Sequence, residues 1–348
     1  MDFSSLQAWQ PPTDWRQIET VDMHTEGEPL RVILGGFPPL EGAHILDYRN
    51  YVRQHWDHLR TALMWEPRGH ADMYGCLLTP PVSAEADFGT FFLHNEGYST
   101  MCGHAIIALT TLAVETGLVE KKSPETRVLI DTPAGLVTAF AVLKGEQVDH
   151  VYFHNVPSFV LGLDQEVQVA KLGKVRYDLA YGGAFYAYVQ AEEIGLSLAA
   201  ENVREIIHQG MAIKRAVMEN STLIQHPFED DLSFLYGTIF IGAVEEGSTA
   251  DNRNVCIFAE GEVDRCPTGT GVSGRMAIHF ARKEIQLAEK MSIESIIGSQ
   301  FQASVLKTCT FGKHEAVIPQ VEGRAYITGK HRFYLDPSDP LRHGFMLR

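Results

Sequence analysis

Apolar runs separated by polar turns recur in the same order in the two halves of the chain. Residues 18–34 read as strand, turn and strand, and residues 175–189 repeat that pattern around a glycine turn. Further along, residues 71–78 resemble residues 232–239. Because the runs are rich in Val, Ile, Phe and Tyr, they predict β-strands. The shared order of the matches indicates a duplicated unit of about half the chain.

Each half also contains one segment with apolar residues at helical spacing directly after glycines. The apolar positions are Ala105, Ile106, Leu109, Leu112 and Ala113 in the first half, and Met276, Ala277, Phe280 and Ala281 in the second. Both helices are predicted to be mostly buried. Short β-rich segments such as 127–131 and 325–329 surround them. A further amphipathic helix is expected over residues 48–64.

These patterns predict an α/β (α+β) protein in which a β-sheet or barrel wraps around a central helix, twice. A chain of 348 residues is long enough for two domains. We expect the first repeat domain at residues 15–172 and the second at 173–335. The C-terminal segment 336–348 is predicted to complete the first domain.

The two helix starts differ at one reactive position. When residues 92–105 are placed in register with residues 258–271, Cys102 falls opposite Thr268. A helix N-terminus offers unpaired N–H groups and partial positive charge, and it can lower a thiol pKa from about 8.5 to between about 3.5 and 7.5. Cys102 is therefore predicted to be a thiolate at neutral pH, whereas a hydroxyl is barely affected.

Two such helix starts facing one cleft would suit a small carboxylate. The N–H groups of Gly103-His104 and Gly269-Thr270 would bind its oxygens, and the Cys102 thiolate would remove the proton from its α-carbon. This chemistry needs no metal. Read alone, the Cys102 motif is equally compatible with a small buried cysteine that only packs.

The sequence leaves two possible roles open for each of three neighbouring side chains. Asp264 is either a capping acceptor or the partner of a substrate ammonium. His104 contributes either its backbone N–H alone or its ring as well. Cys266, two residues before Thr268, is either a second acid or passive, and its place at the helix start favours the passive role. The histidines show no ligand spacing, so no metal site is expected.

Composition narrows the class of protein. A formal charge of −15 without clustered Lys and Arg disfavours nucleic acid and anionic membranes as partners. The five cysteines are scattered without a CxxC pair, which argues against a disulfide framework or structural zinc. The N-terminus lacks the pattern of a signal peptide, and no apolar run is long enough to span a bilayer. We expect a soluble, cytoplasmic protein.

Three ordered motifs make the chain resemble the proline racemase superfamily. They are Asp22–Pro29, Met101–His104 and Asp264–Gly271. The resemblance implies two pseudo-symmetric domains of the diaminopimelate epimerase type, an active site in the cleft between them, no cofactor, and a homodimer. Family racemases and epimerases place a cysteine on each side of the α-carbon. This sequence departs from that pattern at Thr268.

With cysteine at the first position and threonine at the second, the sequence resembles the branch of the family that dehydrates trans-3-hydroxy-L-proline. A threonine hydroxyl cannot act as a reversible acid near neutral pH, so two-base racemisation should fail. The resemblance implies that Cys102 removes the α-proton, that the β-hydroxyl leaves as water, and that Δ1-pyrroline-2-carboxylate forms. It further implies that Gly103, His104, Gly269 and Thr270 hold the carboxylate and that Asp264 holds the ring nitrogen. Thr268 would bond to or protonate the departing hydroxyl.

Two other functions remain open from the sequence. The first is a 4-hydroxyproline epimerase or proline racemase in which Cys266 or a water supplies the second acid. The second is a non-catalytic amino-acid binding protein that retains the carboxylate cradle without turnover.

Overall fold

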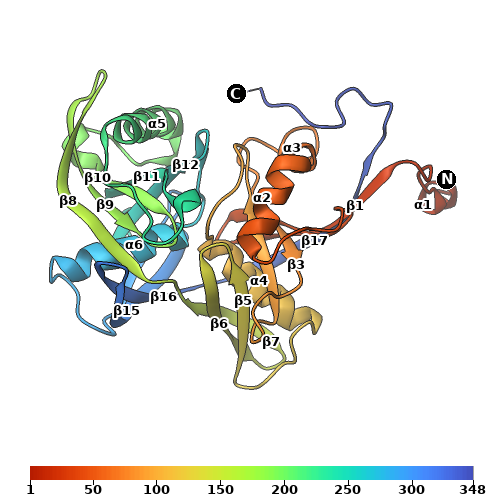
Figure 1. Cartoon of the computed structure of the whole chain (residues 1–348), viewed down its shortest axis with the longest axis horizontal. Helices are drawn as coiled ribbons and strands as arrows, with labels where there is room; N and C mark the ends of the chain where they lie inside the picture. The colour runs from red at the N-terminus through yellow and green to blue at the C-terminus, as the bar shows by residue number, and fades with distance from the viewer. Residues whose placement is uncertain (348) are drawn as a thin grey trace.

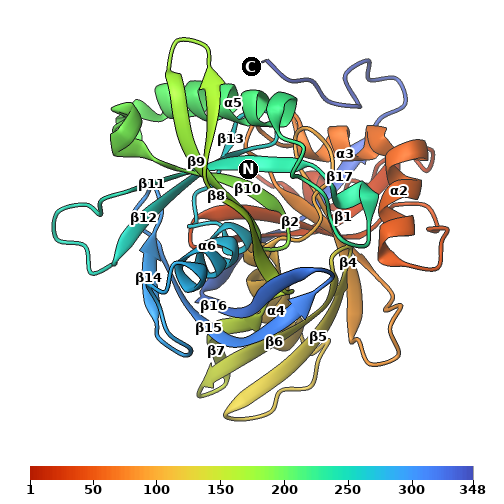
Figure 2. The same ribbon diagram turned by 60° about the vertical axis from the view of Figure 1, so that its left-hand side comes forward.

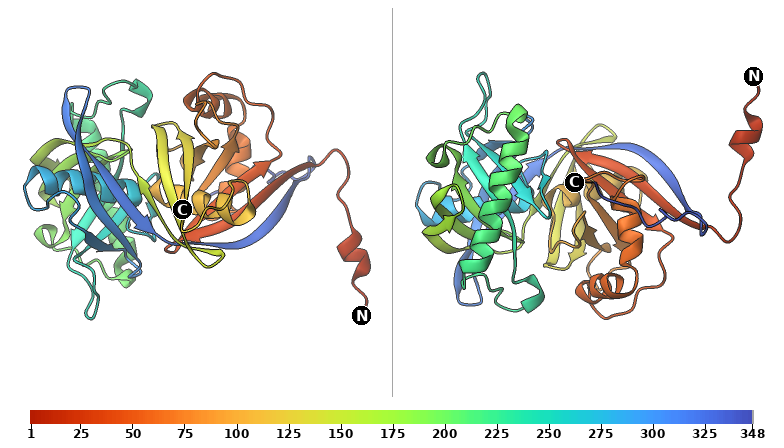
Figure 3. Two further views of the ribbon diagram at one scale, coloured as in Figure 1. Left: turned by 90° about the horizontal axis from the view of Figure 1, so that it is seen from below. Right: turned by 90° about the horizontal axis from the view of Figure 1, so that it is seen from above.

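A computed structural model of the chain describes residues 1–347. The ribbon forms two lobes that lie side by side, with the first-half elements largely in one lobe and the second-half elements in the other (Figure 1). In the turned view the second-half lobe has come forward (Figure 2). The N-terminal helix α1 (Ser4–Ala8) has no buried residue and stands apart from both lobes (Figure 3).

The strands of the first half follow one series of pairings. Each strand pairs with the next, and the pairings run antiparallel, parallel, antiparallel, parallel, antiparallel and antiparallel. In chain order the strands are β1 (Arg16–Thr25), β2 (Glu28–Gly35), β3 (Gly75–Thr79), β4 (Phe88–Leu93), β5 (Glu125–Thr132), β6 (Gly135–Lys144) and β7 (Gln147–His154).

The second half repeats this series pairing by pairing. A two-residue strand, β13 (Glu262–Val263), is added beside its fourth member. The duplicated unit predicted from the sequence is therefore confirmed. The repeated strands are β9 (Gly173–Tyr181), β10 (Phe185–Gln190), β11 (Leu235–Gly242), β12 (Asn252–Phe258), β14 (Met291–Glu294), β15 (Gln300–Phe311) and β16 (His314–Gly323).

A central helix lies inside each lobe. Helix α4 (Gly103–Thr116) follows β4 and is buried from residue 103 to 114, and α6 (Gly269–Ala281) follows the β12–β13 hairpin and is buried from residue 269 to 278. Each packs against several strands of its own half. A helix that is apolar on all sides must be enclosed, and the surrounding sheet encloses it. Gly117, at a φ of 76°, ends α4 in the left-handed region.

Two further strands tie the halves together. β8 (Ser158–Val169) pairs with β9 and β16, whereas β17 (Ala325–Leu335) pairs with β1 along its length. β7 also pairs with β16 across the junction. Residue 172 lies in the turn between β8 and β9, and the division of the chain there stays a prediction. A backbone bridge from Glu66 to Phe345 sets the C-terminal segment against the first half, and Arg348 lies outside the described residues.

The connection between β2 and β3 contains two helices where one was predicted. They are α2 (Ile45–His55) and α3 (Asp57–Met64), separated by Trp56 at φ −133° and ψ 17°, which is outside the helical region. The break re-aims α3, so that Arg60 donates to the carbonyls of His94 and Asn95. The equivalent connection of the second half, between β10 and β11, contains α5 (Val203–Asn220). It also contains the 3₁₀ turns η1 (Ala191–Ile194), η2 (Ala200–Asn202) and η3 (Asp230–Leu232).

Among residues 1–347, no helix combines the length and apolar character needed to cross a bilayer.

Candidate active site

The starts of α4 and α6 meet between the lobes. A Cβ atom added to Gly103 would lie 2.7 Å from the Cα of Gly269, closer than any side chain tolerates. Beside this contact is a small cavity of about 10 Å³, which has room for about one water molecule. It is lined by all seven residues that the sequence singled out, which are Cys102, Gly103, His104, Asp264, Thr268, Gly269 and Thr270. The structure thus brings the two helix starts and their side chains into one enclosed space.

Cys102 is the residue that caps α4. Its backbone is extended, its Sγ accepts the N–H of Ala105 at 3.4 Å, and it lies 3.1 Å from Nδ1 of His104. The thiol therefore projects from the helix start into the cavity, where a substrate α-carbon could approach it.

The prediction that Cys102 is a thiolate at neutral pH is wrong for this closed cavity. Burial raises the pKa of the Cys102 thiol well above its ordinary value, and the carboxyl groups of Asp264 and Glu28 raise it further. The Ala105 N–H and the Tyr74 hydroxyl act in the opposite direction without compensating. Desolvation of the anion outweighs the helix N-terminus here because the thiol is almost fully enclosed.

Thr268, at the start of α6, has an unusual backbone. Its φ of 68° lies in the left-handed region, which costs a non-glycine residue about 1–3 kcal/mol. Its hydroxyl does not cap the helix but donates to Oδ2 of Asp264 at 2.8 Å, and its N–H donates to the sulfur of Cys266 at 3.4 Å. The strained residue is thereby fixed on the wall of the cavity with its hydroxyl bound to a carboxyl group.

Asp264 has a second buried carboxyl group behind it. Glu28 is fully buried, its Oε2 accepts the N–H of Arg265 at 2.7 Å, and its Oε1 has no donor among the described residues. Burial and the neighbouring charge of Asp264 raise the pKa of Glu28 well above its ordinary value. Burial raises the pKa of Asp264 as well, while its hydrogen bond to Glu28 acts in the opposite direction, so the two carboxyl groups favour sharing one proton over ionising together. Sequence reasoning gave Glu28 no role, although it lies in the motif at residues 22–29.

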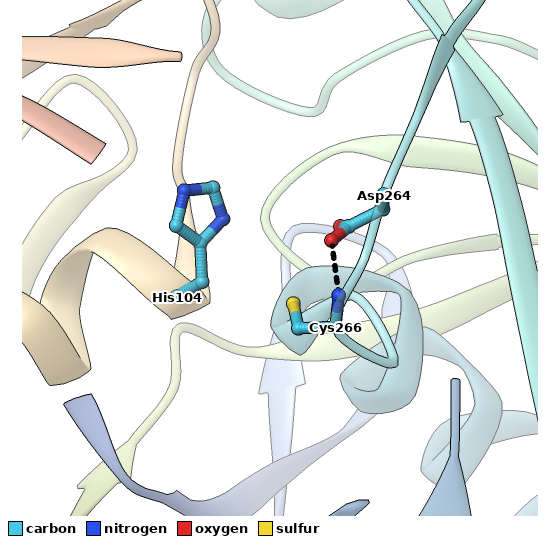
Figure 4. A group of neighbouring side chains, drawn as sticks. All are labelled: His104, Asp264 and Cys266. Carbon is cyan, nitrogen blue, oxygen red and sulfur yellow. Dashed lines mark hydrogen bonds between the residues drawn. The ribbon is translucent and has the colours of Figure 1, made fainter. Parts of the chain in front are cut away.

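His104 and Cys266 approach Asp264 from opposite lobes (Figure 4). Burial lowers the pKa of His104 to about 3, so its ring is neutral. The backbone N–H of Cys266 donates to Oδ1 of Asp264 at 2.9 Å. Possible metal-ligand atoms of these residues lie within 4.8 Å of one another. Both carboxylate oxygens of Asp264 already accept hydrogen bonds, however, so we assign no metal to this group.

Aromatic residues that the sequence did not assign to the site form the rest of the wall. The Tyr236 hydroxyl donates to the Tyr74 hydroxyl at 3.4 Å, and the Tyr186 hydroxyl lies 2.8 Å from Oγ1 of Thr270. Each of the similar segments 71–78 and 232–239 contains a Tyr-Gly pair, at residues 74–75 and 236–237, displaced by one position between the two segments. That match was the signal by which the pair could have been found.

The sequence profile described as proline racemase matches residues 20–346. The chain belongs to the proline racemase family. A protein named trans-3-hydroxy-L-proline dehydratase from Colwellia psychrerythraea is 49% identical over 346 residues, which cover 99% of this chain and 97% of that protein. A human protein of the same name is 44% identical over 336 residues, covering 95% of each chain.

Solved structures of the family have the same fold. The crystal structure of a hydroxyproline epimerase from Agrobacterium vitis, with bound trans-4-hydroxy-L-proline, is 34% identical with a TM-score of 0.89 and covers 95% of this chain and 96% of its own. A structure described as a probable proline racemase from Agrobacterium radiobacter, with bound carbonate, is 32% identical with the same TM-score and coverage. The predicted family and the two-domain epimerase fold are thus confirmed.

Proposed function

We propose that this protein is a hydro-lyase that dehydrates trans-3-hydroxy-L-proline to Δ1-pyrroline-2-carboxylate without a cofactor. The observation that carries the proposal is the cavity in which one thiol, Cys102, stands at one helix start and a threonine, Thr268, stands at the other. The names of relatives that are 44–49% identical over nearly the whole chain support the same activity.

Substrate binding uses both helix starts. The carboxylate is held by the N–H groups of Gly103 and His104 from α4 and of Gly269 and Thr270 from α6, at the positive ends of two helix dipoles. The ring nitrogen, as a secondary ammonium, pairs with Asp264. These contacts fix the α-carbon beside the sulfur of Cys102.

Proton abstraction depends on the charge that the substrate brings. The empty cavity disfavours a thiolate chiefly because Cys102 is buried, and the negative charge of the Asp264 and Glu28 carboxyl groups adds to this effect. The substrate ammonium offsets that negative charge, so binding lowers the thiol pKa toward the working pH. The thiolate then takes the α-proton, and the N–H groups stabilise the charge that moves onto the carboxylate. Each donor of this type is worth about 3 kcal/mol in the transition state.

Loss of the hydroxyl completes the reaction. The electron pair left on the α-carbon forms the Cα–Cβ double bond while the Cβ–O bond breaks. The leaving hydroxide takes the proton of the Thr268 hydroxyl and departs as water. Glu28 passes the shared proton through Asp264 to Thr268, and after product release Glu28 takes one proton from solvent, which balances the proton that the Cys102 thiol released to solvent on substrate binding. The enamine product then tautomerises to Δ1-pyrroline-2-carboxylate.

Incubation with three substrates tests this function. The enzyme should form pyrroline product from trans-3-hydroxy-L-proline, and it should leave trans-4-hydroxy-L-proline and L-proline optically unchanged. Pyrroline formation and optical rotation are followed together. Rapid loss of rotation with either of the last two substrates, and no pyrroline from the first, would refute the proposal.

An epimerase or racemase is the second candidate, because a solved relative is a hydroxyproline epimerase and Cys266 lies near His104. Cys266 is fully buried, and its sulfur accepts the Thr268 N–H, which favours the passive role. A non-catalytic binder is the third. For a binder, Cys102→Ser would keep ligand affinity, and the wild type would have no activity to lose.

Thr268→Cys separates the first two functions. The substitution places a second thiol across the cavity, so we expect inversion of the α-carbon to appear while dehydration falls at least about tenfold. Thr268→Ser is the matched control, since it keeps the hydroxyl and should retain dehydration. Chiral chromatography of recovered substrate measures both. If Thr268→Cys retained configuration at the α-carbon, the assignment of position 268 would be wrong.

We extend the proposal to the state of the protein in the cell. The five cysteines are free, as expected in the reducing cytoplasm. The family resemblance supports a homodimer, which light scattering on the purified protein would test, and a single-chain mass would exclude it. Full activity after dialysis against a chelator would support independence from metals.

A further inference from the structure

Two tyrosines of β10 reach from the sheet to the first turn of α6. Tyr186 and Tyr188 are two residues apart, so they lie on the same face of the strand. The Tyr186 hydroxyl lies 2.8 Å from Oγ1 of Thr270, whereas the Tyr188 hydroxyl donates to the carbonyl oxygen of Gly271 at 2.8 Å. Tyr186 lines the catalytic cavity, and Tyr188 lies outside its wall. The two neighbours therefore differ in their access to the site.

The side chain of Thr270 is held between this tyrosine and the turn that connects β9 to β10. The methyl group of Thr270 packs against Gly183, where an added Cβ would lie 3.1 Å from Cγ2. The hydroxyl group is on the side of Tyr186. A β-branched side chain that is packed on one side and hydrogen-bonded on the other keeps a single rotamer. The position of the Thr270 hydroxyl is therefore fixed before any ligand binds.

The two hydroxyl groups carry two protons but make one hydrogen bond between them. Both side chains are buried, and neither hydroxyl has another hydrogen bond among residues 1–347. A phenol is the stronger donor and an alcohol oxygen the stronger acceptor, so Tyr186 donates to Thr270. The proton of the Thr270 hydroxyl then has no acceptor within the protein. A buried donor nearly always has one, and the cavity that both residues line is where it can be supplied.

We propose that the Thr270 hydroxyl donates a hydrogen bond to the substrate carboxylate, and that Tyr186 is the positioning residue that holds this hydroxyl by donating to it. The inference rests on the proposed function, which already places the carboxylate at the Thr270 N–H. Negative charge moves onto the carboxylate as the α-proton leaves, so the new hydrogen bond strengthens in the transition state. Tyr186 therefore contributes more to kcat than to ground-state binding.

A double-variant cycle tests the coupling between the two residues. Tyr186→Phe removes one hydroxyl and keeps the ring, and Thr270→Val removes the other and keeps both the shape and the N–H. We expect kcat/KM for trans-3-hydroxy-L-proline to fall at least about tenfold in each single variant, mainly through kcat, and to fall no further in the double variant than in Thr270→Val. Additive losses in the double variant would show that Tyr186 acts without Thr270 and would overturn the proposal.

Tyr188→Phe is the matched control. It removes a buried hydroxyl from the same face of β10 that binds the same turn of α6 but does not line the cavity. Its melting temperature should fall by an amount similar to that of Tyr186→Phe, whereas its kcat/KM should stay near that of the wild type. An equal loss of kcat/KM in the two variants would mean that both tyrosines merely anchor α6, and the positioning role would be wrong.

Titration with L-proline separates this inference from the proposed function. L-Proline has the carboxylate but no hydroxyl to lose, so its dissociation constant, measured by calorimetry, needs no turnover. We expect about threefold weaker binding in Tyr186→Phe and in Thr270→Val, with no further weakening in the double variant. That pattern in an enzyme that does not dehydrate trans-3-hydroxy-L-proline would refute the proposed function and keep the hydroxyl pair. Dehydration by the wild type, with L-proline affinity and kcat/KM both unchanged in Tyr186→Phe, would keep the function and overturn the pair.

Discussion

At the scale of single residues, the site is governed by a balance of buried charges. Cys102 is enclosed with Asp264 and Glu28, and each negative charge makes the next one harder to form. Such an arrangement gives a thiolate that is scarce in the empty enzyme and strongly basic once formed. The substrate ammonium is the group that changes the balance, so ionisation of the base is coupled to binding.

Alkylation of Cys102 should report this balance. Because the Cys102 pKa is raised, the thiol is protonated at neutral pH, and the rate of inactivation by iodoacetamide should increase with pH. We expect a midpoint above the ordinary thiol value of about 8.5. Peptide mass mapping identifies the residue, and Cys309→Ser, which removes a half-buried thiol, is the control. A midpoint below about 7.5 would contradict the raised pKa.

Glu28→Gln tests the shared proton. Glutamine keeps the shape and can still donate to Asp264, but it cannot release a proton to Thr268, so kcat should fall at least about tenfold with little change in KM. Glu294→Gln is the matched control, because Glu294 is also almost fully buried but binds Arg253 and Ser248 away from the cavity. An equal loss of kcat in both variants would mean that Glu28 is merely structural.

The same substitution has a stability signature. Because folding raises the pKa of Glu28, its contribution to stability is complete below the ordinary glutamate pKa of about 4.3 and is lost as pH rises through the folded value. Glutamine does not titrate. The melting temperature of Glu28→Gln should therefore decline less than that of the wild type as pH rises above about 4.3. Parallel declines would count against the raised pKa.

At the scale of elements, two helix N-termini that touch create the carboxylate site. The contact requires glycine on both sides, because a Cβ on Gly103 or Gly269 would lie 2.7 Å from the other backbone. A pair of short, opposed N-termini offers N–H groups from two directions, which one helix cannot do. The duplicated fold supplies this pair by repeating one strand-to-helix connection.

Gly103→Ala tests that contact. The added methyl group should push α4 from α6, lower the free energy of unfolding by about 1–3 kcal/mol, and reduce kcat/KM more than stability alone explains. Gly35→Ala is the matched control, since its Cβ would meet nothing within 4 Å. Urea unfolding and steady-state kinetics measure both effects. Wild-type values in Gly103→Ala would show that the helix starts are not in tight contact.

Local patterns predicted most of the elements and seven of the residues that line the cavity, because the repeat placed Cys102 and Thr268 at equivalent helix starts. The aromatic residues of the wall were not predicted. The repeat could not show that Thr268 donates to Asp264 or that Glu28 stands behind it. Those contacts join segments far apart in the chain. The pKa of Cys102 was mispredicted for the same reason, since local sequence indicates the helix N-terminus but not the burial. The break at Trp56 was missed as well, because the contacts of Arg60 that accompany it are with the carbonyls of His94 and Asn95, far away in the chain.

At the scale of the whole molecule, the two lobes enclose the reaction. Polar contacts cross between them, including Arg265 to Asp72 at 3.0 Å and the Asn95 N–H to Glu262 at 2.7 Å. β17 and β7 add backbone pairing across the halves. An enclosed cavity excludes bulk water as a second acid. The carbanion that forms when Cys102 removes the α-proton therefore goes on to product by losing the β-hydroxyl.

The most direct test of this central claim is the fate of the α-carbon in D₂O. The wild-type enzyme is incubated with trans-3-hydroxy-L-proline, and the reaction is stopped part-way for NMR and chiral analysis of product and remaining substrate. Our account predicts pyrroline product, and remaining substrate that keeps its configuration whether or not deuterium has returned through Cys102. Remaining substrate with deuterium at an inverted α-carbon would show a second acid facing Cys102 and would contradict the account.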